Sequence, residues 1–224
     1  MKAIGFFGGT FAPIHNGHLR LAIELQETLG LDVVQVTPSA RPPHRATPGI
    51  SAERRLDWVR LAIGDEPGLR ADDREVRRMV TLGKASYTYD SLAELKAEQP
   101  DAQLFLLLGD DAAHQLPGWH RWRELFDLAH IVVVQRPGHA PPLDAELAAF
   151  LRGRIADTAR ALHAAPQGLW LPVQLPGLAI SSTRIRSLLK AGRSVRGLVP
   201  DPVIRSLTPE DVRALTIEEA AIHD

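Results

Sequence analysis

One stretch near the N-terminus decides the fold of this chain: Gly8-Gly9-Thr10-Phe11-Ala12-Pro13-Ile14-His15-Asn16-Gly17-His18. It follows an apolar run at residues 3–7 and precedes a segment whose apolar side chains recur on one helical face. The pattern therefore predicts a strand, a glycine turn and a helix that begins beside two histidines. The first N–H groups of a helix lack intrahelical partners and carry partial positive charge, so this turn is a candidate anion site.

The residue types in this turn suit a phosphate group on which charge develops. Gly8 and Gly9 let the backbone approach a ligand closely, and the Thr10 hydroxyl and two imidazoles add donors. Taken alone, a glycine pair is also typical of an ordinary turn, and a single histidine is typical of a surface position.

A second stretch, Ile180-Ser181-Ser182-Thr183-Arg184-Ile185-Arg186, predicts another helix N-terminus. One of its hydroxyls is expected to be the N-cap, and the guanidiniums beside free N–H groups form a second phosphate cradle. By itself this pattern also fits an ordinary capped helix with arginines facing solvent.

Length and composition limit the possible classes of protein. The 224 residues suffice for one domain with a small appendage, and 45% apolar and 24% charged residues are typical of a globular protein. A formal charge of −1 gives no field for nucleic acid, and cysteine is absent. No apolar run approaches about 18 residues, so we expect a cytoplasmic protein without a membrane span.

Short apolar runs alternate with helical patterns along the chain, which favours a parallel sheet covered on both faces. We therefore predict an α/β fold: a Rossmann-like, doubly wound parallel sheet in residues 1–200, followed by a helical C-terminal extension in residues 201–224. A continuous helical pattern is expected over residues 143–162. The predicted strands end just before Gly8-Gly9, before Gly109-Asp110-Asp111 and before Arg136. Such sheets bind ligands at the carboxyl ends of their strands.

The two stretches together resemble the signatures G-[GT]-F-D-P-x-H-x-G-H and I-S-S-T-[RK]-I-R of the nucleotidyltransferases. That family transfers an AMP or CMP unit from a nucleoside triphosphate onto a phosphate and releases pyrophosphate. This chain departs from the family pattern at Ala12, where the pattern has Asp. The departure leaves open a non-catalytic nucleotide-binding sensor as an alternative.

The middle of the chain is similar to the bacterial nicotinate-nucleotide adenylyltransferases. The segments that carry this resemblance are Pro42-Pro43-His44-Arg45, Ser86-Tyr87-Thr88-Tyr89-Asp90, Gly109-Asp110-Asp111, Pro117-Gly118-Trp119-His120-Arg121-Trp122 and Arg136-Pro137-Gly138. The resemblance implies that ATP and nicotinate mononucleotide react to give nicotinate adenine dinucleotide and pyrophosphate. It also implies Mg²⁺ that accompanies ATP, without a dedicated protein metal site. Another acceptor, such as nicotinamide mononucleotide, and a homo-oligomeric state both remain open.

Carried over residue by residue, the resemblance implies three sets of site residues. The catalytic set is His15, His18 and Arg186. The ATP-binding set is Gly8, Gly9, Thr10, Phe11, His15, Gly17, His18, Gly109, Asp111, Ile180, Ser181, Ser182, Thr183 and Arg186. The set for nicotinate mononucleotide is His44, Arg45, Thr88, Trp119, His120 and Arg136. Without the resemblance, Trp119 and Trp122 would be interpreted as core residues, because buried aromatic side chains dominate cores.

Overall fold

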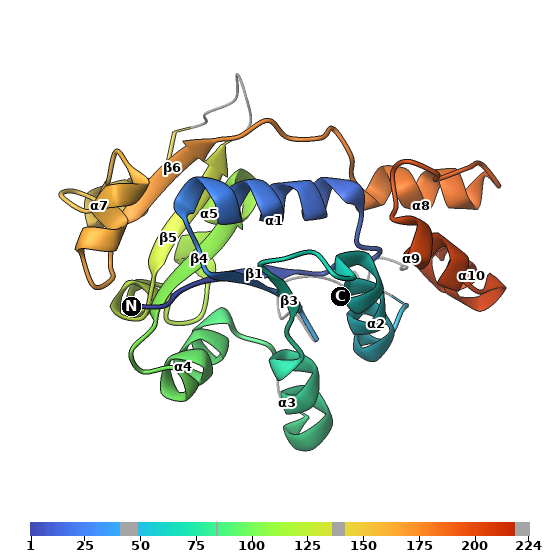
Figure 1. Cartoon of the computed structure of the whole chain (residues 1–224), viewed down its shortest axis with the longest axis horizontal. Helices are drawn as coiled ribbons and strands as arrows, with labels where there is room; N and C mark the ends of the chain where they lie inside the picture. The colour runs from blue at the N-terminus through green and yellow to red at the C-terminus, as the bar shows by residue number, and fades with distance from the viewer. Residues whose placement is uncertain (41–48, 84, 136–141, 218–224) are drawn as a thin grey trace.

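The structure is a computed structural model that describes residues 1–40, 49–83, 85–135 and 142–217. Within these residues, six parallel strands form one sheet in the order β3-β2-β1-β4-β5-β6 (Figure 1). The strands are β1 (Ala3–Gly9), β2 (Val33–Pro38), β3 (Leu69–Ala71), β4 (Gln103–Gly109), β5 (His130–Gln135) and β6 (Trp170–Gln174). This order is that of the doubly wound dinucleotide-binding sheets, so the predicted fold class is confirmed.

Helices connect the strands and follow the last one. They are α1 (Asn16–Leu29), α2 (Ala52–Ile63), α3 (Arg74–Leu82), α4 (Thr88–Glu98), α5 (Asp110–His114), α6 (Ala145–Phe150), α7 (Ala159–Ala164), α8 (Ser182–Lys190), α9 (Asp201–Ser206) and α10 (Pro209–Thr216), with the 3₁₀ turns η1 (Leu116–Gly118) and η2 (Trp122–Asp127). Several helix ends have a clear local cause. Gly30 ends α1 in the left-handed conformation, and the hydroxyls of Ser51 and Ser181 cap α2 and α8.

Two expectations about helices are wrong. The expected helix over residues 143–162 is two short helices, α6 and α7. The chain leaves the helical path between them, with Gly153 at φ +74° and Ile155 in a bridge to Trp170 of β6. The helix α3 was not expected; three of its nine residues are arginines, and the structure leaves Val80 and Leu82 largely exposed. Ion pairs to neighbouring elements hold it instead, as described below.

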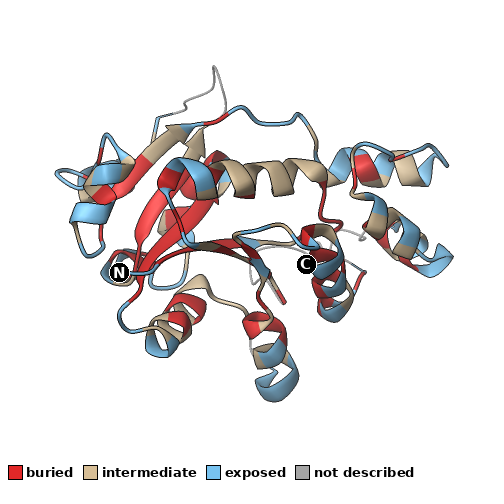
Figure 2. Cartoon of the chain, in the orientation of Figure 1, coloured by how far each residue is buried: buried red, intermediate tan, exposed pale blue. Residues whose placement is uncertain are grey.

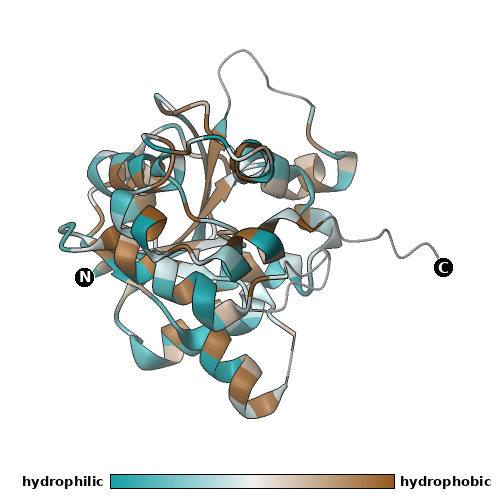
Figure 3. Cartoon of the chain, turned by 90° about the vertical axis from the view of Figure 1, so that its right-hand side faces the viewer, coloured by the Kyte–Doolittle hydropathy of each residue, from teal (hydrophilic) through white to brown (hydrophobic). Residues whose placement is uncertain are grey.

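The core lies on both faces of the sheet, because successive strand residues point to opposite sides. In β4, Phe105 and Leu107 pack toward α1 and α8, whereas Leu104, Leu106 and Leu108 pack toward α4 and η2. Figure 2 shows the central strands and the inner sides of the helices as buried. Figure 3 shows brown, apolar strands at the centre and helices of mixed polarity around them. The carboxyl ends of the strands lie level, since Gly9 pairs with Pro38 and Gly109 with Val134.

The C-terminal helices pack against the edge of the sheet domain beside α8 and α2 (Figure 1). The guanidinium of Arg54 on α2 forms an ion pair of 2.7 Å with Asp211 of α10 and donates to the carbonyl of Ser206. The division of the chain at residue 200 stays a prediction. Among the described residues, no helix combines the length and apolar character that a membrane crossing needs.

Candidate active site

Two adjoining hollows open at the carboxyl ends of β1 and β4, where the strand order reverses. We call the larger one, of about 950 Å³, the groove, and the smaller one, of about 180 Å³, the pocket. The backbone turn Gly8-Gly9-Thr10 and the start of α5 line both of them. A ligand in the groove and a ligand in the pocket would therefore meet at this turn, at the switch point where doubly wound sheets bind ligands.

The groove brings together every residue that the sequence predicts for ATP. It is lined by the turn after β1, the first turn of α1, the strand end at Gly109 and the first turns of α8. The predicted residues among its lining are Gly8, Gly9, Thr10, Phe11, His15, Gly17, His18, Gly109, Asp111, Ile180, Ser181, Ser182, Thr183 and Arg186. Two stretches that are far apart in the sequence thus place two helix N-termini on one groove, which favours an anion with several charges.

The two histidines cap the helix α1 for each other. His15 is the N-cap, and its Nδ1 accepts from the backbone N–H of His18 at 3.3 Å, while Nδ1 of His18 accepts from the N–H of His15 at 3.3 Å. Their rings are stacked, with centroids 3.6 Å apart, and the Phe11 ring meets His18 edge-on at 5.0 Å. This is a capping box in which both side chains are imidazoles.

Each Nδ1 accepts a hydrogen bond, so each neutral ring carries its proton on Nε2. Burial lowers the pKa of His15 to about 4, although a contact with its own backbone raises it slightly. Burial also lowers the pKa of His18 to about 3, and the neighbouring His15 contributes further. Both imidazoles are therefore neutral near pH 7, and each retains one N–H donor that helix capping does not use.

Glycines keep this turn compact. A Cβ on Gly17 would lie 3.0 Å from Nδ1 of His15, and a Cβ on Gly9 would lie 2.7 Å from the ring of Phe11. Both distances leave no room for a side chain without moving a ring, which explains why these two positions of the motif need glycine.

The start of α8 is attached to the turn that precedes α1. Nη1 of Arg186 donates to the carbonyl of Ala12 at 3.0 Å, and Oγ of Ser182 donates to the carbonyl of Pro13 at 3.1 Å. The other end of the Arg186 guanidinium donates to Oγ1 of Thr183 at 3.3 Å. The half-buried side chain of Arg186 is thus held in the wall of the groove by the Ala12 carbonyl and the Thr183 hydroxyl.

The pocket contains Thr88, Trp119 and His120, which are half of the residues predicted for the mononucleotide. The ring of His120 lies against that of Tyr87, with centroids 4.5 Å apart. Trp122, by contrast, is 5% exposed and packs in the core against Phe150, so the core interpretation applies to it. The other three predicted residues, His44, Arg45 and Arg136, lie outside the described residues.

Sequence reasoning missed several residues that line the two hollows. Ser39 and Glu75 line the pocket, and residues 214–217 at the end of α10 line the groove. Glu75 belongs to the unexpected helix α3, and no short motif surrounds these positions. Only the three-dimensional fold brings them to the site.

The carboxylates of the groove come from Asp110 and Asp111 at the start of α5. No group of three or more potential metal ligands occurs within the part of the chain that the structure describes. The donor set thus fits Mg²⁺ that arrives with a nucleotide, because this ion keeps water and phosphate ligands and needs few carboxylates from the protein.

Comparisons with known proteins identify the family of this chain. Residues 6–188 match the family model described as cytidylyltransferase-like. The chain is 49% identical over 206 residues to a "Probable nicotinate-nucleotide adenylyltransferase" of Chromohalobacter salexigens, covering 91% of this chain and 92% of the relative. A protein of the same name from Marinobacter nauticus is 46% identical over 202 residues, covering 90% of this chain and 92% of the relative.

A solved structure shares the fold. It is the Plasmodium falciparum nicotinic acid mononucleotide adenylyltransferase complexed with NaAD, with a TM-score of 0.63, 15% identity and coverage of 96% of this chain and 95% of the other. At that identity the likeness concerns the fold alone, whereas the sequence relatives establish the family and confirm the resemblance. The chain therefore belongs to the cytidylyltransferase-like family and, within it, to the nicotinate-nucleotide adenylyltransferases.

Proposed function

We propose that this protein transfers AMP from ATP to nicotinate mononucleotide, giving nicotinate adenine dinucleotide and pyrophosphate for NAD biosynthesis. The observation that carries the proposal is the shared wall of groove and pocket, Gly8-Gly9-Thr10, beside His15 and His18. ATP in the groove and a mononucleotide in the pocket would bring their phosphates to this wall. The names of the sequence relatives support the same reaction.

The reaction is a direct displacement at the α-phosphorus of ATP. An oxygen of the acceptor's 5′-phosphate forms the new bond, and the bond from the α-phosphorus to the oxygen that bridges to the β-phosphate breaks, releasing pyrophosphate. The attacking phosphate is already ionised, so it needs neither a general base nor a protein nucleophile. Catalysis then consists of positioning and of stabilising the charge that develops.

The two histidines are suited to that stabilisation. Each neutral ring presents an Nε2–H donor, and the positive end of α1 lies behind both. We assign to His18 the contact with the oxygens of the α-phosphoryl group, to His15 the same phosphates, and to Thr10 an additional donor.

The start of α8 is the candidate site for the leaving group. The hydroxyls of Ser182 and Thr183 and the fork of Arg186 line the groove. A planar guanidinium matches phosphate oxygens better than a point charge does. We therefore assign the β- and γ-phosphates to this wall.

Mg²⁺ would be held chiefly by the phosphates of ATP and by water, together with at most a carboxylate from Asp110 or Asp111. When bound, it supplies charge neutralisation on the triphosphate. The two histidines and the start of α8 would orient the triphosphate, because contacts within the protein fix their positions.

The pocket provides the selection of the acceptor. Trp119 would stack on the pyridine ring, and Thr88 with His120 would donate to the ring's carboxylate, since charge-assisted hydrogen bonds are stronger than neutral ones. We place the activity in the cytoplasm on small-molecule substrates. A pyrophosphate-release assay with ATP and Mg²⁺ tests the function, with nicotinate or nicotinamide mononucleotide as acceptor. We expect pyrophosphate to be released when nicotinate mononucleotide is the acceptor. If no pyrophosphate is released with either acceptor, the protein binds nucleotides without transferring AMP.

A further inference from the structure

Two buried side chains of opposite charge lie beside the pocket, and neither belongs to a motif discussed so far. Arg55 on α2 is fully buried, and Glu75 on α3 is 5% exposed. Burying a charged group is costly unless hydrogen bonds and nearby charges compensate it. The partners of these two residues therefore indicate why the fold retains them.

Among the described residues, the hydrogen bonds that Arg55 donates go to backbone carbonyls. Its Nη1 contacts the carbonyl oxygens of Thr10 at 2.8 Å and Ser39 at 2.7 Å, and its Nη2 contacts that of Ala40 at 3.3 Å. Burial lowers the pKa of Arg55 to about 10, while the charges of Glu53 and Glu75 act in the opposite direction. The guanidinium thus stays protonated at neutral pH and ties together two separate strand ends.

Two of those three carbonyls, the ones of Thr10 and Ser39, belong to residues that line the pocket. Thr10 lines both the pocket and the groove, and Ser39 lines the pocket. The N–H of Ser39 also donates to the carbonyl of Gly9 at 2.8 Å. The segment that continues from Ala40 carries His44 and Arg45, which are predicted to bind the mononucleotide. Arg55 therefore sets the relative position of the β1 turn and the end of β2.

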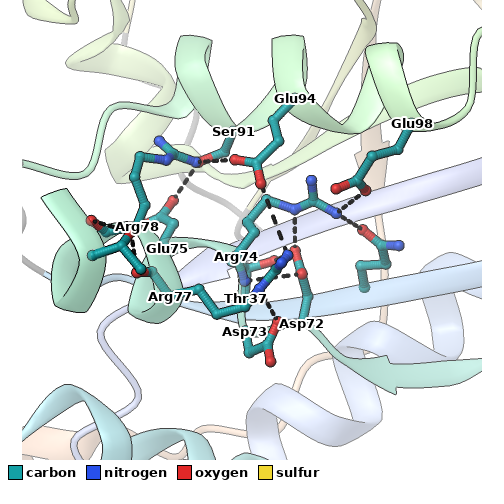
Figure 4. A network of polar contacts seen from close by, with 12 residues as sticks. Thr37, Asp72, Asp73, Arg74, Glu75, Arg77, Arg78, Ser91, Glu94 and Glu98 are labelled. Carbon is teal, nitrogen blue, oxygen red and sulfur yellow. Dashed lines mark hydrogen bonds and ion pairs between the residues drawn. The ribbon is translucent and has the colours of Figure 1, made fainter.

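Glu75 contacts the first turn of α4, another element that lines the pocket. Its Oε1 accepts from the hydroxyl of Ser91 on α4 at 2.9 Å, and its side chain lines the pocket (Figure 4). Burial raises the pKa of Glu75, whereas hydrogen bonds from the Ser86 hydroxyl and the Ala40 amide and the charge of Arg78 lower it. Ser86 and Ser91 flank Tyr87, the N-cap of α4, and Thr88, its first residue, and both of these line the pocket.

We propose that Arg55 and Glu75 are positioning residues for the acceptor substrate: they clamp the β1 turn, the end of β2 and the start of α4 into the arrangement that binds the mononucleotide. Ala40 lies at the centre of this clamp, with its carbonyl bonded to Arg55. The inference rests on the proposed function, since it concerns the affinity for nicotinate mononucleotide. It adds two residues that would not contact the substrate's reacting atoms.

A second buried pair provides a matched control. Arg74 and Asp72, 3% and 8% exposed, form an ion pair of 2.6 Å, and Thr37 donates to the same carboxylate at 2.9 Å (Figure 4). Arg74 lies next to Glu75 in α3, yet neither Arg74 nor Asp72 lines the groove or the pocket. Substitution there should disturb a buried charge without disturbing the walls of the pocket.

The experiment compares Arg55→Lys, Glu75→Gln and Arg74→Lys with the wild type in steady-state kinetics and thermal unfolding. A lysine keeps the charge of Arg55 but lacks the planar fork that reaches three carbonyls. We expect Arg55→Lys and Glu75→Gln to raise the KM for nicotinate mononucleotide at least tenfold and to change the KM for ATP less than threefold. Arg74→Lys should lower the unfolding temperature without changing either KM by more than threefold.

The proposal would be wrong if Arg55→Lys and Glu75→Gln raised both KM values equally. It would also be wrong if Arg74→Lys raised the KM for nicotinate mononucleotide as much as the other two variants do, since either result indicates a general loosening of the fold. If Arg55→Lys does not fold, Glu75→Gln decides the question, because it keeps the size of the side chain while it replaces one accepting carboxyl oxygen with an amide group that donates. The proposed function is tested separately by the wild type. A wild type that does not convert nicotinate mononucleotide refutes the function, whereas an active wild type with unaltered variants refutes only the clamp.

Discussion

The groove and the pocket adjoin each other, but they are built differently. The groove takes most of its donors from two contiguous stretches of sequence, each of which begins a helix, and the second stretch is attached to the first through the carbonyls of Ala12 and Pro13. The pocket collects residues from β1, the loop after β2, α3, the start of α4, β4, α5 and the segment around η1. A site for a triphosphate can therefore be specified locally, whereas a site for a particular acceptor depends on the whole fold.

The largest expected effect tests the chemical role of the groove. His18→Ala removes one donor from the developing charge, and loss of such a donor lowers turnover by about a hundred- to a thousandfold, or ~2.7–4 kcal/mol. The fold should persist, since loss of a capping contact costs only about 1 kcal/mol. Steady-state kinetics and circular dichroism measure both quantities, with His163→Ala, an exposed residue of α7 that lines neither hollow, as the control. An unchanged kcat in folded His18→Ala would contradict the assignment.

The next effect tests the selectivity of the pocket. The neutral amide of nicotinamide would leave donors unpaired, at about 1–3 kcal/mol each, so two mismatches give a preference for nicotinate mononucleotide of about a hundredfold in kcat/KM. Thr88→Ala should reduce this preference, while Trp119→Ala should weaken both substrates alike because stacking does not distinguish the rings. Equal kcat/KM values for the two mononucleotides in the wild type would contradict the selectivity that we assign to the pocket.

A smaller effect should separate the two hollows. Arg186→Ala removes a charged contact from the groove, which is worth about 1.5–3 kcal/mol, so binding of ATP should weaken by about ten- to a hundredfold. Binding of nicotinate mononucleotide should stay nearly intact, because Arg186 does not line the pocket. Calorimetry with each ligand measures this, and selective loss of mononucleotide binding would place Arg186 on the wrong side.

Acid should destabilise the folded protein because His15 and His18 in the groove resist protonation. The pKa values of His15 and His18 lie near 4 and 3, below the value of 6.5 in an unfolded chain. Between pH 6.5 and pH 5 the unfolded chain binds protons that the native protein does not, so the free energy of unfolding falls as the pH falls. Each histidine contributes at most ~1.4 kcal/mol per pH unit. Urea titrations of wild type and of the His15→Gln, His18→Gln double variant should show a smaller slope for the variant; parallel slopes would contradict the low pKa values.

The smallest effect concerns the departure from the family pattern. An Asp at position 12 could hydrogen-bond the nearby backbone and stiffen the turn before Pro13. In this protein Arg186 and Ser182 already hold the carbonyls of Ala12 and Pro13. We therefore expect Ala12→Asp to improve turnover or affinity for ATP by no more than a few-fold. Kinetics of this single variant measure it, and no gain in either parameter would show that the turn is not weakened.

The sequence predicted the sheet and the two phosphate-binding stretches of the groove, but not residues 214–217, which also line the groove. The apolar runs predicted the strands, and the hydroxyls of the second stretch predicted a helix start, which Ser181 caps. These features are local, so a short window contains their cause. The family pattern also indicated Thr88 and Trp119, which lie in the pocket.

The rest depended on contacts between distant residues. Helix α3 has an N-cap, Asp73, whose side chain makes no capping bond, and Arg74 and Arg78 pair with carboxylates on other elements. The pattern over residues 143–162 predicted one helix. The structure interrupts it, because Ile155 pairs with Trp170 of β6 between α6 and α7. Glu75 could not be assigned to the pocket because its partners are on α4 and at the end of β2.

The reciprocal capping of His15 and His18 has a consequence for how such chains change during evolution. Because the Nδ1 atoms of the same two rings close the end of α1, selection for folding preserves these histidines whether or not the protein still reacts. A duplicated copy that had lost its activity would keep the pair for a long time. The earliest record of such a loss should therefore appear at groove positions that cap no helix, and the two histidines alone cannot date it.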